Sequence, residues 1–155
     1  RDKFISLEQE ISLLQNYLEI EKMRFGDDFT FNFNIDENLN LNEQKIPSML
    51  LQPIVENAVN HGLFHNKGKG TITINFHFNS TTEYTVEIKD NGVGLKKARE
   101  IKENSIRTHI SKSSEILKDR IQLLNQSKDW HITYFINEQE NTKGTCVKLT
   151  FKNNG

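Results

Sequence analysis

The stretch Leu51-Gln-Pro-Ile-Val-Glu-Asn-Ala-Val-Asn-His-Gly62 decides the fold, because its apolar residues recur with the period of an α-helix. At about 100° per residue, one arc of that helix holds only apolar side chains: Ile54, Val55, Ala58 and Val59. We therefore predict an amphipathic helix over about residues 49–61 that covers a core and ends at Gly62. Because Pro53 is tolerated only in a first turn, the helix either starts near Gln52 or follows a short turn.

The opposite arc of this helix is polar and has an unusual composition. It carries a carboxylate, two amides and an imidazole, and no lysine or arginine: Glu56, Asn57, Asn60 and His61. Oxygen ligands of this kind are those that a hard cation such as Mg²⁺ prefers. A plain solvated face is the alternative, and the helix alone leaves both interpretations open.

Outward from this helix, the sequence predicts a two-layer α/β sandwich of the α+β class. Alternating apolar and polar residues predict five strands, over 29–35, 72–78, 84–90, 130–136 and 145–151. Helical spacing predicts further helices over 7–25 and 114–125. Short links between most strands favour a mixed, mostly antiparallel sheet, and helices with one apolar face must cover one side of it.

The opening helix has clear end signals. Ser6 and Gln9 have the spacing of a capping box, and Gly26 is a natural helix stop. Between them, apolar residues recur at spacings of four and three: Leu7, Ile11, Leu14 and Leu18. The helix either packs on the sheet or belongs to a linker or dimerisation region.

Composition narrows the class of protein. The chain has 155 residues, of which 35% are hydrophobic and 26% charged, and its net charge of −1 offers no basic field for a nucleic-acid backbone. The single cysteine, Cys146, excludes an internal disulfide and fits a reducing compartment. No apolar run approaches the roughly 20 residues that span a bilayer. The chain begins at Arg1 rather than Met, so we expect a piece of a longer protein.

A carboxylate stands at the end of the predicted strand 84–90. One parity of that strand is shared by Tyr84, Val86, Ile88 and Asp90. If the apolar residues face the core, so does Asp90, and a buried carboxylate is costly unless it is hydrogen-bonded, for example by a ligand. Gly92 and Gly94 follow and let the backbone approach a ligand closely. A hairpin turn is the alternative, but residues 95–101 do not alternate like a returning strand.

Thr145 opens the last predicted strand, directly after Gly144. It has the parity of three apolar residues: Val147, Leu149 and Phe151. A hydroxyl directed into the core can bond a neighbouring carboxylate or a water. An ordinary β-branched strand residue is an equally good interpretation of Thr145 taken alone.

Together these motifs resemble a known ATPase superfamily. The stretch Leu51–Gly62 is similar to the asparagine box of the gyrase, Hsp90, histidine kinase and MutL proteins, in the wording of the LytS/YesM-type sensor histidine kinases. Asp90-Asn-Gly-Val-Gly94 resembles their first glycine box, and Gly144-Thr145 their last. The opening helix, with Tyr17-Leu-Glu-Ile-Glu-Lys-Met-Arg-Phe-Gly26, resembles the one that joins the phosphoacceptor region to the ATPase domain. The fold that this resemblance implies is the Bergerat ATP-binding fold.

The resemblance implies roles for the polar helix face. Asn57 would coordinate Mg²⁺, and Glu56 would be the polar or basic partner beside it, so that both would be catalytic. Asn60 and His61 would lie near the ATP phosphates.

It also implies an adenine pocket at the strand ends. Asp90 would accept the adenine amino group, Gly92 and Gly94 would shape the pocket wall, and Thr145 would support Asp90. Residues 93–112 would form a mobile lid over ATP.

For the whole chain, the resemblance implies a histidine kinase catalytic domain over 27–155, preceded by a joining helix over 1–26. It would transfer the γ-phosphoryl group of ATP to a histidine outside this chain, and from there to a response regulator. The parent would be a membrane-associated homodimer with this domain on the cytoplasmic side.

Two departures from the family pattern keep other functions open. The second glycine box is missing from the region around residues 109–120, and none of the five histidines lies in an Asn-Pro-His-Phe context. The phosphoacceptor would then precede Arg1. A nucleotide-binding or interaction module without turnover is one alternative, and a hydrolytic ATPase of the same superfamily is another.

Overall fold

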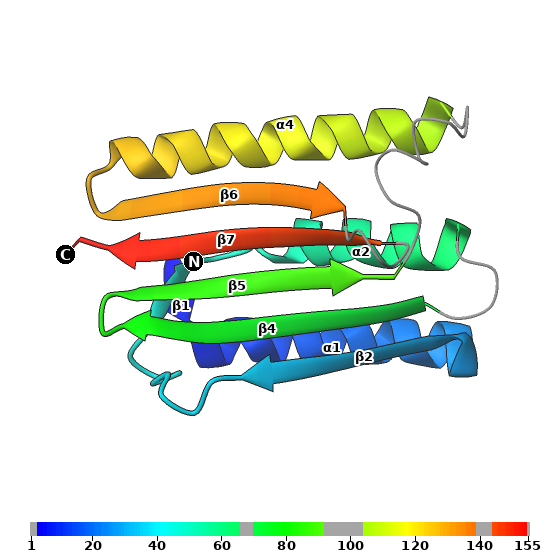
Figure 1. Cartoon of the computed structure of the whole chain (residues 1–155), viewed down its shortest axis with the longest axis horizontal. Coiled ribbons are helices and arrows are strands. Elements are labelled where there is room, and N and C mark those ends of the chain that lie inside the picture. The colour runs from blue at the N-terminus through cyan, green and yellow to red at the C-terminus, as the bar shows by residue number, and fades with distance from the viewer. Residues whose placement is uncertain (1–2, 66–69, 92–103, 139–143, 155) are drawn as a thin grey trace.

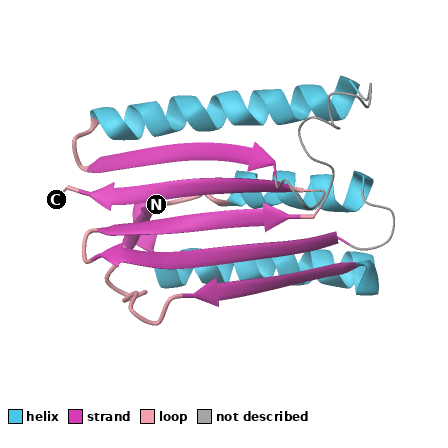
Figure 2. Ribbon diagram, in the orientation of Figure 1, coloured by secondary structure: helices cyan, strands magenta, loops and turns pink. Residues whose placement is uncertain are grey.

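The computed structural model describes residues 3–65, 70–91, 104–138 and 144–154. The strands are β1 (Phe4–Ser6), β2 (Phe29–Ile35), β3 (Lys45–Pro47), β4 (Gly70–Ser80), β5 (Glu83–Asp90), β6 (Trp130–Glu138) and β7 (Thr145–Asn153). The helices are α1 (Leu7–Phe25), α2 (Gln52–His65) and α4 (Asn104–Gln126), with a 3₁₀ turn, η1 (Gly26–Asp28), after α1. Together they form a two-layer α/β sandwich (Figures 1 and 2), and this confirms the predicted fold class.

Five strands form the main sheet in the order β2-β4-β5-β7-β6. The β2–β4 pair is parallel, while β4–β5, β5–β7 and β6–β7 are antiparallel. The sheet is therefore mixed and mostly antiparallel, as predicted. β5 lies in the middle and is paired along both edges, so the residues at its end are enclosed by two neighbouring strands.

The three helices bury their apolar sides against the sheet. In Figure 1, α1 and α2 lie behind the strands, and α4 runs beside β6. α1 contacts β2, and α2 contacts β4 and β5. Side chains from α1, α2 and the strands belong to one core cluster, and α1 supplies Leu7, Ile11, Leu14 and Leu18. The opening helix is therefore packed on this sheet.

Local sequence signals set the ends of α1. The Ser6 hydroxyl accepts a hydrogen bond from the Gln9 backbone N–H at 3.1 Å, and the Gln9 side chain accepts one from the Ser6 N–H at 3.0 Å. Gly26 ends the helix with a φ of 65°, a conformation that glycine adopts without steric cost. Both predicted end signals are confirmed.

The structure differs from the sequence prediction at several boundaries and in two short strands that were not predicted. α2 continues through Gly62 to His65, because a glycine inside a helix costs only about 1 kcal/mol and packing can offset it. α4 begins at Asn104, so the second half of the predicted lid, 104–112, is helical, and residues 93–103 lie outside the described residues. β1 and β3 pair with each other and have three residues each, too few to show a period.

Candidate functional site

The candidate site lies at the end of the sheet where β5 finishes and β7 begins. Asp90 is paired with Thr145 of β7 on one side and with Ile72 of β4 on the other. The last turns of α2 lie at the same end of the molecule (Figure 1). The sheet order thus brings together the acid, the threonine and the helix that the sequence singled out separately.

Asp90 is buried although it is the last residue of its strand. Its side chain shares the inner face of β5 with buried Tyr84, Val86 and Ile88, and the residue is only 4% exposed. β5 pairs with β4 and β7 along its two edges, so it has no free edge for a strand that returns directly after Asp90. The hairpin alternative is therefore wrong.

Thr145 adds an unsatisfied polar group beside Asp90. The residue is 2% exposed, and its Oγ1 atom has no hydrogen-bond partner among the residues that the structure describes. A buried hydroxyl without a partner costs about 1–3 kcal/mol. An inward-facing hydroxyl of this kind fits a site that is completed by a ligand or a water.

Gly144 lets the chain pass directly over the end of β5. A Cβ atom at this position would lie 2.0 Å from the Asp90 carbonyl oxygen and 3.0 Å from the Asp90 carbonyl carbon. Only glycine fits at such a separation. The Gly144-Thr145 pair is therefore packed against the backbone of Asp90, a close approach that the sequence analysis did not predict.

Asn91 has a structural role that the sequence analysis missed. Its side-chain Oδ1 accepts a hydrogen bond from the Thr71 N–H at 2.8 Å, and its own N–H donates to the Thr71 carbonyl at 3.3 Å. These bonds hold the residue after Asp90 onto β4. A strand-end asparagine next to a glycine was the available signal, since asparagine side chains often bond nearby backbone.

The α2 helix divides into two faces as predicted. Its inward side chains are all buried: Ile54, Val55, Ala58 and Val59. Glu56, Asn57 and Asn60 are partly exposed. His61 lies within α2, and its side chain is outside the described part, as are Gly92 and Gly94 altogether.

Glu56 faces α1. Its Oε1 accepts a hydrogen bond from Gln52 Nε2 at 3.3 Å, one turn earlier. On α1, burial raises the pKa of Tyr17, and together with the charges of Glu21 and Glu56 it brings this pKa to about 12. Because Asn57 is rotated by about 100° from Glu56 on the helix, the two side chains point in different directions. The catalytic role assigned to Glu56 stays a prediction.

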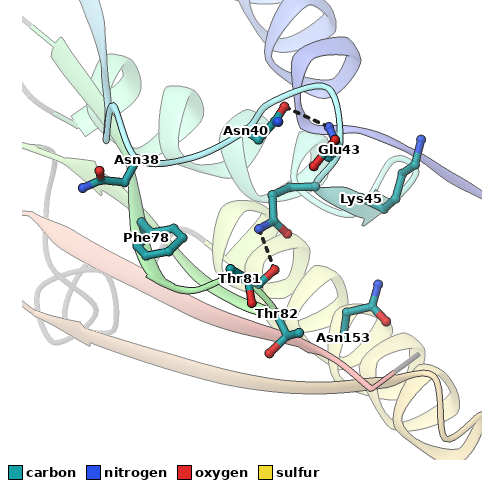
Figure 3. A pocket seen from close by; sticks show the side chains of 9 residues that line it. Asn38, Asn40, Glu43, Lys45, Phe78, Thr81, Thr82 and Asn153 are labelled. Atoms are coloured by element: carbon teal, nitrogen blue, oxygen red, sulfur yellow. Dashed lines mark hydrogen bonds between the residues drawn. The ribbon is translucent and has the colours of Figure 1, made fainter.

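A hollow lies at the end of the sheet opposite to Asp90 (Figure 3). It has a volume of about 320 Å³ and is lined mainly by amides and hydroxyls. Gln44 Nε2 donates to the Thr81 carbonyl at 3.0 Å, and Asn40 Oδ1 accepts from the Glu43 N–H at 3.3 Å. These polar groups bond to neighbouring backbone, so they fix the loop before β3 on the β4–β5 hairpin.

Comparison with known proteins agrees with the sequence motifs. The histidine kinase family model matches residues 1–29. The chain is 38% identical over 94 residues to the sensor histidine kinase YpdA of Escherichia coli and 35% identical over 94 residues to the sensor protein LytS of Oceanobacillus iheyensis. Each match covers 61% of this chain and 16% of the relative, so the chain spans about a sixth of their length.

The fold has close counterparts among solved structures. The catalytic domain of histidine kinase ThkA superposes with a TM-score of 0.61 over 97% of this chain and 94% of that chain, at 15% identity. A further structure holds ThkA in complex with the response regulator TrrA, with a TM-score of 0.59 over 97% of this chain and 41% of that chain. The chain is thus related in sequence to LytS-type sensor histidine kinases and has the fold of histidine kinase catalytic domains. This confirms the predicted resemblance.

Proposed function

We propose that this chain is the ATP-binding catalytic domain of a two-component sensor histidine kinase. It would transfer the γ-phosphoryl group of ATP to a histidine outside the chain, from which a response regulator takes it. The observation that carries this proposal is the buried Asp90 carboxylate beside the Thr145 hydroxyl, which has no hydrogen-bond partner among the described residues, at a strand end that Gly144 packs against.

These groups suit a nucleobase. A carboxylate accepts hydrogen bonds when ionised, and the exocyclic amino group of adenine is a donor. The Thr145 hydroxyl can donate to Asp90 or to a ring nitrogen and so recover the bond that it lacks among the described residues. Adenine binding would therefore remove the free-energy cost of the buried Thr145 hydroxyl as well as add contacts.

Asn57 is the residue that we assign to Mg²⁺, with Asn60 and His61 near the phosphates and Gly92 and Gly94 along the pocket wall. The amide oxygen of Asn57 is a suitable hard ligand, and the metal, when bound, neutralises phosphate charge. The chain's own contribution would be positioning: Asp90 holds the base, and α2 holds Asn57 at a set distance along the nucleotide.

The family resemblance seen in the sequence also implies a setting for this domain. The parent protein would be a homodimer anchored in a membrane, with this domain in the cytoplasm and residues 1–26 joining it to the phosphoacceptor region. None of the helices in the described part of the chain has the length and apolarity that crossing a bilayer requires. ThkA binds the response regulator TrrA, and a similar regulator would be the partner here.

The decisive experiment is nucleotide titration of the Asp90→Asn variant by calorimetry. We expect the wild-type chain to bind ADP saturably and Asp90→Asn to lose about 100-fold in affinity, since the amide replaces a charged acceptor by one that also presents donors. Asp119→Asn, at an exposed position on α4, is the matched control and should bind like the wild type. Unchanged affinity in Asp90→Asn would mean that the pocket is assigned wrongly.

The same purified chain also distinguishes the two alternative functions. A module without nucleotide function would give no saturable binding with or without Mg²⁺. A hydrolytic ATPase would release phosphate steadily from ATP without an acceptor histidine.

A further inference from the structure

Arg120 joins two parts of the chain that are about seventy residues apart. From α4, its Nη1 donates to the Met49 carbonyl at 2.8 Å, and its Nη2 donates to the Ser48 carbonyl. The side chain is partly buried. One planar guanidinium thus bonds two consecutive backbone carbonyls, a geometry that the flexible point charge of lysine does not reproduce.

The carbonyls belong to the turn from which α2 starts. Met49 has a φ of 61°, a left-handed conformation that is uncommon for residues with a side chain. Directly after it, Leu50 and Leu51 are completely buried, and the Leu51 carbonyl accepts a hydrogen bond from the Val55 N–H at 3.0 Å. The turn therefore sets where α2 enters the core, and Arg120 stabilises an otherwise unfavourable backbone there.

A third element acts on Arg120 through its charge. The Glu10 carboxylate of α1 is 1% exposed and acts electrostatically on the guanidinium. Burial lowers the pKa of Arg120, and the charge of Glu10 opposes that shift. Nearby, the Tyr84 hydroxyl donates to the Lys45 carbonyl at 2.7 Å, so the segment before α2 is held from the sheet as well.

We propose that Arg120 is a positioning residue for the magnesium site: it fixes α2, and with it Asn57, relative to α4. This inference rests on the proposed function. Asn57 lies five residues after the start of α2, about 8 Å along a rigid helix, so a shift of the turn would be carried to the Asn57 amide. Arg120 therefore links α4 to the turn from which α2 starts.

The test measures ADP affinity with and without Mg²⁺ in Arg120→Ala, Arg120→Lys and the control Lys118→Ala, which removes an exposed charge from the same helix. We expect Arg120→Ala to lose about tenfold in affinity when Mg²⁺ is present, the range found for groups that orient metal ligands. Without Mg²⁺ its affinity should stay within about twofold of the wild type, since Asp90 is untouched. Arg120→Lys should recover part of the loss, and Lys118→Ala should match the wild type.

Two outcomes would overturn this role. Equal losses with and without Mg²⁺ would mean that Arg120 supports the fold only, and unchanged affinities would mean that it positions nothing. If Arg120→Ala does not fold, Arg120→Lys becomes the test of the proposal. Its ADP affinity should then fall several fold in the presence of Mg²⁺ and stay unchanged without it. A failure of the wild-type chain to bind ADP would reject the proposed function itself and is recognisable as a separate result.

Discussion

Two aspartates close two strands at opposite ends of the sheet, and their surroundings differ. Asp36 follows β2, and its carboxylate oxygens accept hydrogen bonds from the N–H groups of Asn38 and Phe78, each at 3.0 Å. Asp90 ends β5 beside a buried hydroxyl that has no partner among the described residues, at a backbone against which Gly144 is packed. The same residue type thus closes a turn at one end and contributes to a candidate site at the other.

The difference shows what marks a binding site in this fold. At the Asp36 end, polar side chains bond to adjacent backbone and leave a partly exposed, self-contained loop (Figure 3). At the Asp90 end, polar groups are buried and one of them lacks a partner within the described part of the chain. Because buried unpaired groups are costly, they persist where a ligand or a water completes them.

The largest effect is expected from Gly144→Ala. Its Cβ would be 2.0 Å from the Asp90 carbonyl oxygen, so the backbone must shift. We expect a loss of about 2–3 kcal/mol in unfolding free energy, measured in urea, and loss of ADP binding.

Gly26→Ala is the matched control, because Gly26 has a positive φ but no atom within 4 Å of an added Cβ. It should cost about 1 kcal/mol and leave binding intact. Normal binding by Gly144→Ala would contradict this account.

Thr145→Val should have an intermediate effect, limited to the affinity for ADP. The variant replaces a hydroxyl that has no partner in the described part of the chain by a methyl group of similar shape. The unfolding free energy should therefore stay level or rise by up to about 1 kcal/mol. ADP affinity should fall about three- to tenfold, which corresponds to the loss of one ordinary hydrogen bond. Thr150→Val on the same strand provides the contrast, because Thr150 Oγ1 lies 3.3 Å from Thr85 Oγ1. Thr150→Val should lower the unfolding free energy without changing ADP affinity. A loss of affinity in Thr150→Val together with a loss of stability in Thr145→Val would contradict the comparison.

The smallest effect is expected from Asp36→Asn, and it depends on pH. The backbone N–H groups of Asn38 and Phe78 hold the pKa of Asp36 below its ordinary value. A depressed pKa stabilises the folded state above the unfolded pKa of about 3.9, and this contribution is lost as pH falls through the folded value. Urea unfolding of wild type and variant should therefore differ at pH 7 and converge in acid, while ADP affinity at pH 7 is the same. Parallel pH profiles would show that Asp36 contributes nothing.

Interactions within one element were predictable. The capping box of Ser6 and Gln9 acts over three residues, and the inward direction of Asp90 follows from strand parity. The division of α2 into two faces follows from its period. The motifs also led to the correct fold, through their resemblance to histidine kinase ATPase domains, whose fold this chain shares.

By itself, then, the sequence determined the amphipathic elements, their caps and the side of the sheet on which Asp90 lies, since these depend on periods and short-range bonds. Tertiary structure alone decided the parallel β2–β4 pair, the fit of Gly144 over Asp90 and the reach of Arg120 to Ser48 and Met49. Such contacts join residues that are forty to seventy positions apart, and no local pattern encodes them. They form only when burial of the shared core brings the elements together.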